Sequence, residues 1–204
     1  MSVDFDSIMK MPAIGQVIAN AIEEGRKHGQ TFLSDSCWMN DRDRMANYAL
    51  YEATLWSVGS GIGNGLLGIA GIPTDVAITL YSQVKLSSTL FTIYGIDITN
   101  QATQPLVLAA AAGVTISELA NNLGTRAATQ AIQKALMSIP GKTFAEINKA
   151  LGIKIISKAG EKTLLNVAKM MPGIGSIVSG TVNGVTMNAT GHGIITFVKA
   201  WKRA

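Results

Sequence analysis

Four polar residues in otherwise apolar predicted helices could hold a ligand or move a proton: Asp75, Lys85, Asn183 and His192. Such chemistry requires the groups to converge on one cleft. Asp75 and Lys85 share one face of a predicted helix, but ten residues of helix separate them by ~15 Å, so they cannot pair with each other. Each needs another partner if it is buried. We expect a buried polar network that includes Asn183 or His192, and a solvent-facing polar cleft is the alternative.

The sequence around His192 does not indicate catalysis. This residue lies between Gly191 and Gly193 in the last predicted helix, which favours a histidine hydrogen-bonded between helices. No Gly-x-Ser-x-Gly elbow accompanies it. The other candidate metal ligands, His28 and Cys37, are distant in sequence and share no motif with it. We therefore identify no catalytic set and predict no metal site and no cofactor.

Two glycine-containing segments resemble phosphate-binding loops only superficially. The stretch 63–68 matches Gly-x-Gly-x-x-Gly, but this pattern binds dinucleotides only where a strand turns into a helix. The residues before it have a helical pattern, so we favour helix packing. The segment 140–143 reads Pro-Gly-Lys-Thr, yet Leu136 stands where a phosphate loop requires glycine. Neither segment predicts nucleotide binding.

The elements that must position these residues are all expected to be helices, because strand signals are scarce. The pattern predicts seven or eight helices in a single compact bundle with glycine-rich central helices. The narrow polar stripe of the segment 74–94 predicts a core helix. The first three expected helices run from Pro12 to Gly25 or Gly29, from about Asn40 into the glycine-rich segment 59–71, and over 74–94 with a left-handed cap at Gly95. The next run from Pro105 to Gly113 and begin at capping boxes at Thr115–Glu118 and Thr143–Glu146. The last two cover 160–171 and about Gly173 to Trp201.

Glycines four residues apart indicate where two helices approach closely. Six glycines occur between residues 59 and 71, and a similar run follows residue 172. Small residues at this spacing let two backbones come together. We predict that the two runs form an intramolecular close-packed helix pair, and a second use in lipid stays open. The glycines concerned are Gly59, Gly63, Gly65, Gly180 and Gly184.

The composition indicates a chain that buries much of its length. Of 204 residues, 48% are hydrophobic and only 15% are charged, with a net charge of +4. No Lys/Arg run with interleaved aromatics predicts a nucleic-acid partner. The single cysteine, Cys37, excludes an intramolecular disulfide and suits a reducing compartment. The first residues lack a signal-peptide pattern, so we expect a cytoplasmic protein. We also expect it to associate peripherally with the membrane, for the reasons given next.

The C-terminal region carries the features that suggest membrane contact. Residues 170–198 contain no Asp, Glu, Lys or Arg, and this length could cross a bilayer. Polar side chains on several faces argue against a lone lipid-exposed span. A basic, aromatic end follows, of the kind that settles at anionic membrane surfaces. It could equally be a solvated turn that complements the helix dipole. Its residues are Lys199, Trp201, Lys202 and Arg203.

The order of several short segments resembles the EcsC family of bacterial proteins. They are Gly71-Ile-Pro-Thr-Asp75, Gln83-Val-Lys-Leu86, Ile93-Tyr-Gly-Ile-Asp97, Met171-Pro-Gly-Ile-Gly175, and Asn183 with the glycines around His192. The resemblance implies an EcsC-like all-α domain over 40–204, preceded by an N-terminal helical extension over 1–39. It implies a cytoplasmic or loosely membrane-associated protein, and it carries no agreed reaction.

Three functions remain open from the sequence. We favour a non-enzymatic helical accessory protein that associates with a membrane surface or a membrane protein, of unknown oligomeric state. The second is a membrane-inserting toxin or effector, suggested by the uncharged stretches. The third is an enzyme or small-ligand-binding protein with a polar cleft near Asp75 and Lys85.

Overall fold

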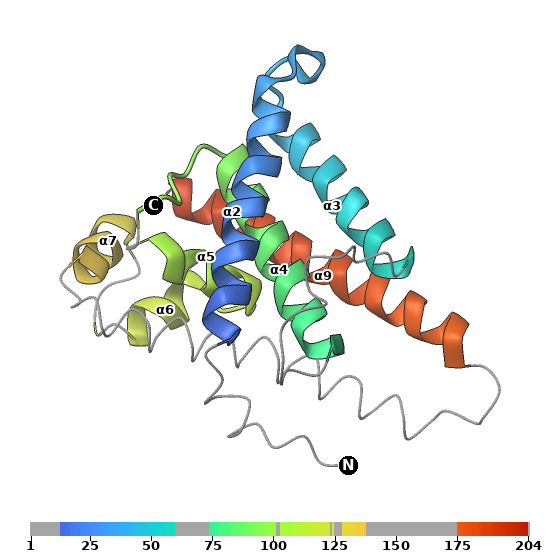
Figure 1. The fold of residues 1–204 in the computed structure, drawn as a ribbon. Helices are drawn as coiled ribbons and strands as arrows, with labels where there is room; N and C mark the ends of the chain where they lie inside the picture. Colours follow the sequence, from blue (N-terminus) through green and yellow to red (C-terminus); the bar gives the residue numbers. More distant parts are fainter. Residues whose placement is uncertain are drawn as a thin grey trace.

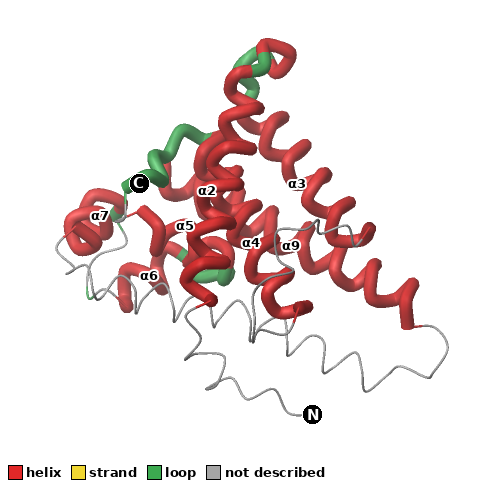
Figure 2. The backbone as a smooth tube through the Cα atoms, viewed as in Figure 1, coloured by secondary structure: helices red, strands yellow, loops and turns green. Residues whose placement is uncertain are grey.

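The computed structural model describes residues 13–59, 74–100, 103–122, 124, 128–137 and 175–203. Within these residues the chain forms seven α-helices and one 3-10 helix, and no strand (Figure 2). The predicted all-α bundle is therefore confirmed. The elements are α2 (Ala13–Ser34), η1 (Ser36–Trp38), α3 (Arg42–Gly59), α4 (Thr74–Ile93), α5 (Gln104–Ala111), α6 (Ile116–Asn122), α7 (Thr129–Met137) and α9 (Gly175–Arg203).

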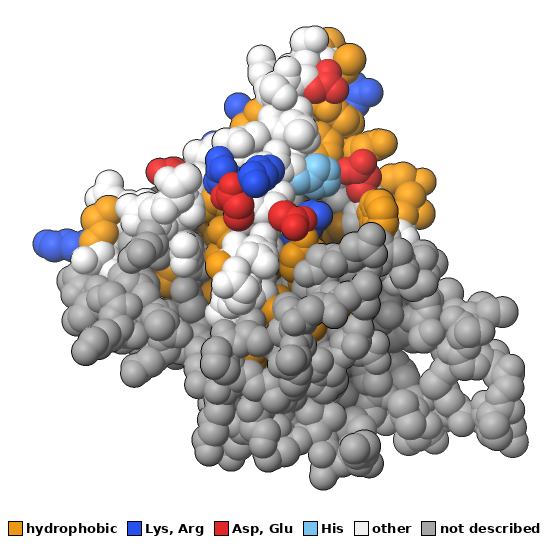
Figure 3. All heavy atoms as spheres, viewed as in Figure 1, with side chains coloured by type: hydrophobic (Ala, Val, Ile, Leu, Met, Phe, Trp, Pro, Cys, Tyr) orange, Lys and Arg blue, Asp and Glu red, His pale blue; other side chains and the backbone are white. Residues whose placement is uncertain are grey.

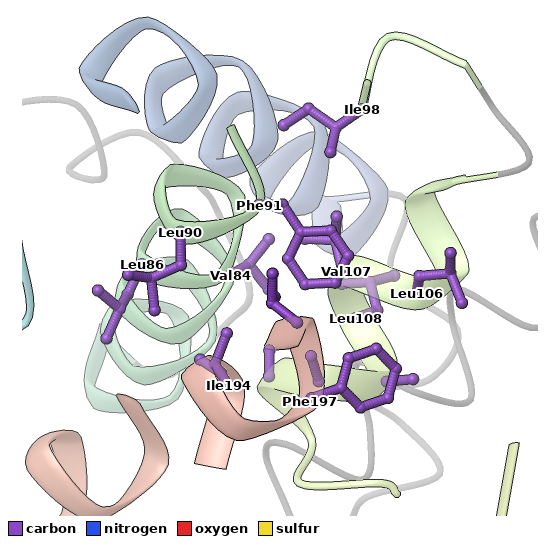
Figure 4. Packing of buried hydrophobic residues seen from close by; sticks show 14 of the residues in the cluster. Val84, Leu86, Leu90, Phe91, Ile98, Leu106, Val107, Leu108, Ile194 and Phe197 are labelled. Atoms are coloured by element: carbon purple, nitrogen blue, oxygen red, sulfur yellow. The ribbon is translucent and has the colours of Figure 1, made fainter. Parts of the chain in front are cut away.

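Helix α4 lies at the centre of the bundle, and α2, α3, α5 and α9 each pack against it (Figure 1). Its residues Val84, Leu90 and Phe91 are completely buried. Figure 4 shows the side chain of Phe91 close to those of α5 and α9, and its ring centroid lies 6.1 Å from that of Phe197. The sequence correctly predicts a core helix here, because only a narrow stripe of α4 is polar.

The closest helix contact joins α2 to α4 through two glycines. A Cβ atom added at Gly25 would lie 2.3 Å from the carbonyl oxygen of Lys85, and one at Gly29 would lie 2.6 Å from Thr92 Cβ. The prediction that one of these glycines ends the first helix is wrong, because α2 continues to Ser34. Four residues apart, they lie on one face of α2 and let the two backbones meet.

The polar stripe of α4 faces α2 along this contact. Thr89 Oγ1 lies 3.1 Å from the carbonyl oxygen of Gly25 and 2.9 Å from that of Lys85. Thr92 Oγ1 donates to the carbonyl oxygen of Ser88 at 2.9 Å. These buried hydroxyls thus have partners in or across the interface, which offsets the cost of removing them from water.

The ends of several helices show the capping features that the sequence predicts. Thr115 and Glu118 form the predicted capping box, with each backbone N–H donating to the other side chain at 2.9 and 3.2 Å. Gly95 adopts φ +76° after α4, and Gly113 adopts φ +66° after α5. Both turns close with a 6→1 hydrogen bond, such as Ile96 N to Phe91 O at 2.9 Å.

The glycine pairs singled out in the sequence are only partly placed. Gly59 is the last residue of α3, and Gly180 and Gly184 lie in α9, but their surroundings are not described. Gly63 and Gly65 lie outside the described residues, as do the capping box at 143–146 and the predicted helix 160–171. Their close packing stays a prediction.

The helix α7 was not predicted from the sequence. The helix α2, by contrast, belongs to the same core as the rest of the bundle. Six residues of α2, among them Val17 and Ala21, belong to the same hydrophobic core as residues of α3, α4 and α9. The helix α2 therefore packs into the body, and the predicted domain boundary stays a prediction.

The close contact of α2 with α4 predicts opposite effects for two alanine substitutions in α2. Gly25→Ala forces a backbone shift and should lower the free energy of unfolding by about 1–3 kcal/mol. Gly15→Ala is the matched control, since a Cβ there meets nothing within 4 Å. It should raise stability by roughly 0.5–1 kcal/mol through helix propensity. Urea unfolding measures both, and a Gly25→Ala protein as stable as Gly15→Ala would contradict the packing described here.

Candidate functional site

The structure places two of the four predicted site residues. Lys85 is half-buried on α4, and its Nζ lies 3.2 Å from Oε2 of Glu24 on α2. His192 is exposed on α9, so it is not enclosed between helices as predicted. The side chains of Asp75 and Asn183 lie outside the described residues. Lys85 thus pairs with a residue that the sequence did not indicate.

The orientation of α9 explains the exposure of His192. Gly191 is buried against α3, where an added Cβ would lie 2.2 Å from Leu50 Cδ1. Ile194 and Val198 are also buried. A residue one position after Gly191 points away from this face, since adjacent positions on a helix are about 100° apart.

Charged side chains of α2, α3 and α4 meet in a cluster on the surface. His28 Nε2 of α2 lies 3.3 Å from Glu52 Oε2 of α3. The Tyr81 hydroxyl of α4 donates to Glu24 Oε2, which also receives the contact from Lys85. Figure 3 shows a histidine among acidic side chains on this face. We name these five residues the charged cluster.

Burial and pairing set the protonation of the charged cluster. Burial lowers the pKa of His28 below its ordinary value, although the neighbouring Glu52 opposes this. The Tyr81 hydroxyl lowers the pKa of Glu24, and burial raises the pKa of Tyr81 itself. Glu52 Oε2 is buried and accepts no hydrogen bond from the described residues. Glu52 Oε2 and His28 Nε2 are nevertheless 3.3 Å apart, and the lowered pKa of His28 favours its neutral form at neutral pH.

The outer face of α3 carries an exposed apolar band, which we name the aromatic stripe. The exposed fractions are 44% for Tyr48, 57% for Tyr51, 51% for Leu55 and 63% for Trp56. Tyr48, Tyr51 and Leu55 are three and four residues apart and lie on one side of the helix. Trp56 follows Leu55 directly and lies about 100° further round, at the edge of this side. The opposite side of α3 is buried in the core through Met45, Ala46, Ala49 and Leu50. The helix α3 is thus apolar on two faces.

The aromatic stripe continues toward the tip of the α2–α3 hairpin through rings in tilted contact. Tyr48 lies 6.2 Å from Tyr51 and 5.1 Å from Trp38 between ring centroids. The Arg44 guanidinium lies 5.5 Å from the Trp38 ring centroid. Met39 at the tip is 78% exposed. The hairpin projects from the body (Figure 1), and hydrophobic side chains gather along its α3 side (Figure 3).

The sequence alone did not identify the aromatic stripe as exposed. It shows the same apolar residues on α3, but a helix with two apolar faces looks like a buried one. Exposed contiguous apolar residues are unusual on a protein surface and commonly mark a binding site. The spacing of Tyr48, Tyr51 and Leu55 on the side away from Met45 and Ala49 is the signal that could have indicated it.

The basic C-terminal end is used within the molecule. Trp201 is only 4% exposed, so the prediction that it lies at the surface is wrong. Its packing into the core follows from the position of the last turn of α9 beside α4. Lys202 Nζ donates to the carbonyl oxygen of Tyr94 at 2.9 Å, and Arg42 donates to that of Ile93 at 2.6 Å. These cations complement the C-terminal end of the α4 dipole.

A second contact joins α9 to α3 beside this helix end. Lys199 Nζ donates to Asp43 Oδ2 at 2.8 Å, and the Tyr94 hydroxyl donates to Asp43 Oδ1 at 2.6 Å. Of the predicted membrane-surface residues, Lys199 and Lys202 are thus paired, and Arg203 is exposed. The alternative prediction is that the basic C-terminal residues complement a helix dipole. Lys202 does so, but the dipole is that of α4 and not that of α9.

A cavity of about 440 Å³ lies between the loop after α4, α7 and the end of α9. Its charged lining residues are already engaged, because Lys202 donates to Tyr94 and Asp97 accepts from the Thr99 hydroxyl. Nowhere in the described part do three or more His, Cys, Asp or Glu side chains form a group able to hold a metal ion. Neither feature indicates chemistry.

Comparisons with protein-family models, curated proteins and solved structures found no match to this chain. The resemblance to the EcsC family therefore stays an interpretation of the sequence. Among the described helices, none combines the length and the apolar character needed to cross a membrane.

The contacts of Asp43 predict how stability depends on pH. The Lys199 ammonium and then the Tyr94 hydroxyl lower the pKa of Asp43. A folded-state pKa below the unfolded one gives stability that is complete above the unfolded value, about 4, and is lost as the pH falls through the folded value. The advantage of the wild type over Asp43→Asn in free energy of unfolding should therefore shrink in acid. The advantage of the wild type over Lys199→Gln should shrink in acid in the same way. A constant difference in free energy of unfolding between wild type and Asp43→Asn across this pH range would contradict the proposed role of Asp43.

Proposed function

We propose that this protein is a non-enzymatic accessory protein that associates peripherally with a membrane surface through the aromatic stripe. The observation that carries the proposal is the exposure of four large apolar side chains along α3. The interaction is peripheral, with the stripe entering the headgroup region while the bundle stays folded.

The residue types of the stripe favour a lipid surface as the partner. Tyrosine and tryptophan combine an apolar ring with a polar tip, which suits the boundary between headgroups and acyl chains. The hairpin forms a projecting ridge, so it can lie along a flat surface (Figure 1). The net charge of +4 supports attraction to anionic lipids. Within α3, Glu52 is the single charged residue after Arg44.

Co-sedimentation with vesicles tests this function. The wild-type protein should bind vesicles of phosphatidylcholine and phosphatidylserine at low and at physiological salt. Tyr51→Ser and Trp56→Ser should each weaken binding about tenfold, since each removes about 1–2 kcal/mol of apolar burial. The fluorescence of Trp56 should shift to shorter wavelength on binding, because the ring leaves water.

Met137→Ser is the matched control for these variants. Met137 is 68% exposed on α7, outside the stripe, so its loss should leave binding unchanged. Absence of wild-type binding to vesicles would overturn the lipid proposal. Capture by a membrane protein without vesicle binding would point to a protein partner for the same stripe.

A further inference from the structure

The side chain of Glu52 lies at the edge of the aromatic stripe. It follows Tyr51 directly and precedes Trp56 by four residues, about one helical turn. Its Oε2 atom is buried without a hydrogen bond from the described residues, 3.3 Å from His28 Nε2. The Glu52 side chain is 33% exposed, so water reaches part of the carboxylate, while His28 is the neighbour of the buried oxygen. The charge on His28 decides whether the charge of Glu52 is compensated.

We propose that protonation of His28 neutralises the charge beside the aromatic stripe, so that the protein binds an anionic lipid surface more tightly in acid than at neutral pH. This inference rests on the function proposed above and adds its regulation. The imidazole and the stripe are also physically continuous. The His28 and Phe32 ring centroids lie 5.2 Å apart with the rings tilted, and Phe32 lies 6.2 Å from Tyr48 between ring centroids.

The groups around His28 leave one negative charge when it is neutral. From α4, the Lys85 ammonium acts on it and is paired with Glu24 of α2, and the Tyr81 hydroxyl donates to the same Glu24. From α3, Glu52 faces it. The remaining charged residues of α2 pair with one another on its exposed side: Glu23, Arg26 and Lys27. A protonated His28 therefore brings the charged cluster from a net charge of −1 to zero.

The transition lies in the acid range. Because burial dominates at His28, its pKa is below the ordinary imidazole value of about 6.5. The neutral form prevails at pH 7, and protonation occurs as the pH falls below that ordinary value. One charge near an anionic surface is worth about 1 kcal/mol, or about a fivefold change in binding.

Vesicle co-sedimentation at about pH 7.5 and about pH 5, at constant ionic strength, tests the inference. Wild-type binding to phosphatidylcholine–phosphatidylserine vesicles should rise about fivefold in acid. His28→Gln should lose this rise and bind weakly at both pH values. Glu52→Gln should bind as tightly at neutral pH as the wild type does in acid. Circular dichroism of each variant confirms that the helices are retained.

Asp97→Asn is the matched control for a general charge effect. It removes one negative charge from an exposed loop outside the cluster, and it should keep the wild-type rise. An unchanged rise in His28→Gln, or equal wild-type binding at both pH values, would overturn the regulation. If Trp56→Ser also binds as the wild type does at both pH values, the proposed function itself fails. A weakened Trp56→Ser together with a pH-independent wild type leaves the function standing without this regulation.

Discussion

The backbone contact between α2 and α4 is the constraint on which the rest of the structure depends. Only glycine leaves room at residues 25 and 29, because an added Cβ would overlap atoms of α4. The short separation lets Thr89 reach the carbonyl oxygen of Gly25. With α2 covering its polar stripe, the other faces of α4 are largely apolar and are covered by α3, α5 and α9. The buried Ser87 hydroxyl on the α5 side donates to the carbonyl oxygen of Val107. The hydrophobic core follows from the covering of these faces.

Burying α4 creates a second requirement at its C-terminal end. The last carbonyl oxygens of a helix have no partner within the helix, and a buried end must obtain donors from elsewhere. The left-handed turn at Gly95 supplies two of them. Arg42 and Lys202 supply two more, and they come from segments 160 residues apart in sequence. The basic C-terminal end of the chain thus stabilises the end of α4 within the fold.

The placement of α3 leaves the feature that points to function. One side of α3 packs on α9 and α4 through small and apolar residues, among them Ala46 and Ala49. Tyr51 on the other side and Trp56 at the edge of that side extend into solvent. No requirement of the core explains this exposure, since a polar residue at either position would leave the packing intact. An interaction surface gives these rings a role, and Glu52 places a titratable contact beside them.

The sequence by itself determined most of the described helices, several of their caps and the core position of α4, because these depend on local periodicity and on side chains within a few residues. The capping box at Thr115 and the turn at Gly95 are examples. Only the tertiary structure decided which side of each helix faces out. Gly25 appears as a helix end in sequence and as a packing contact in space, and Trp201 appears as an anchor and is buried. His28 and Glu52 meet although 24 residues separate them. Such pairings depend on how whole helices pack, which the periodicity of one helix does not contain.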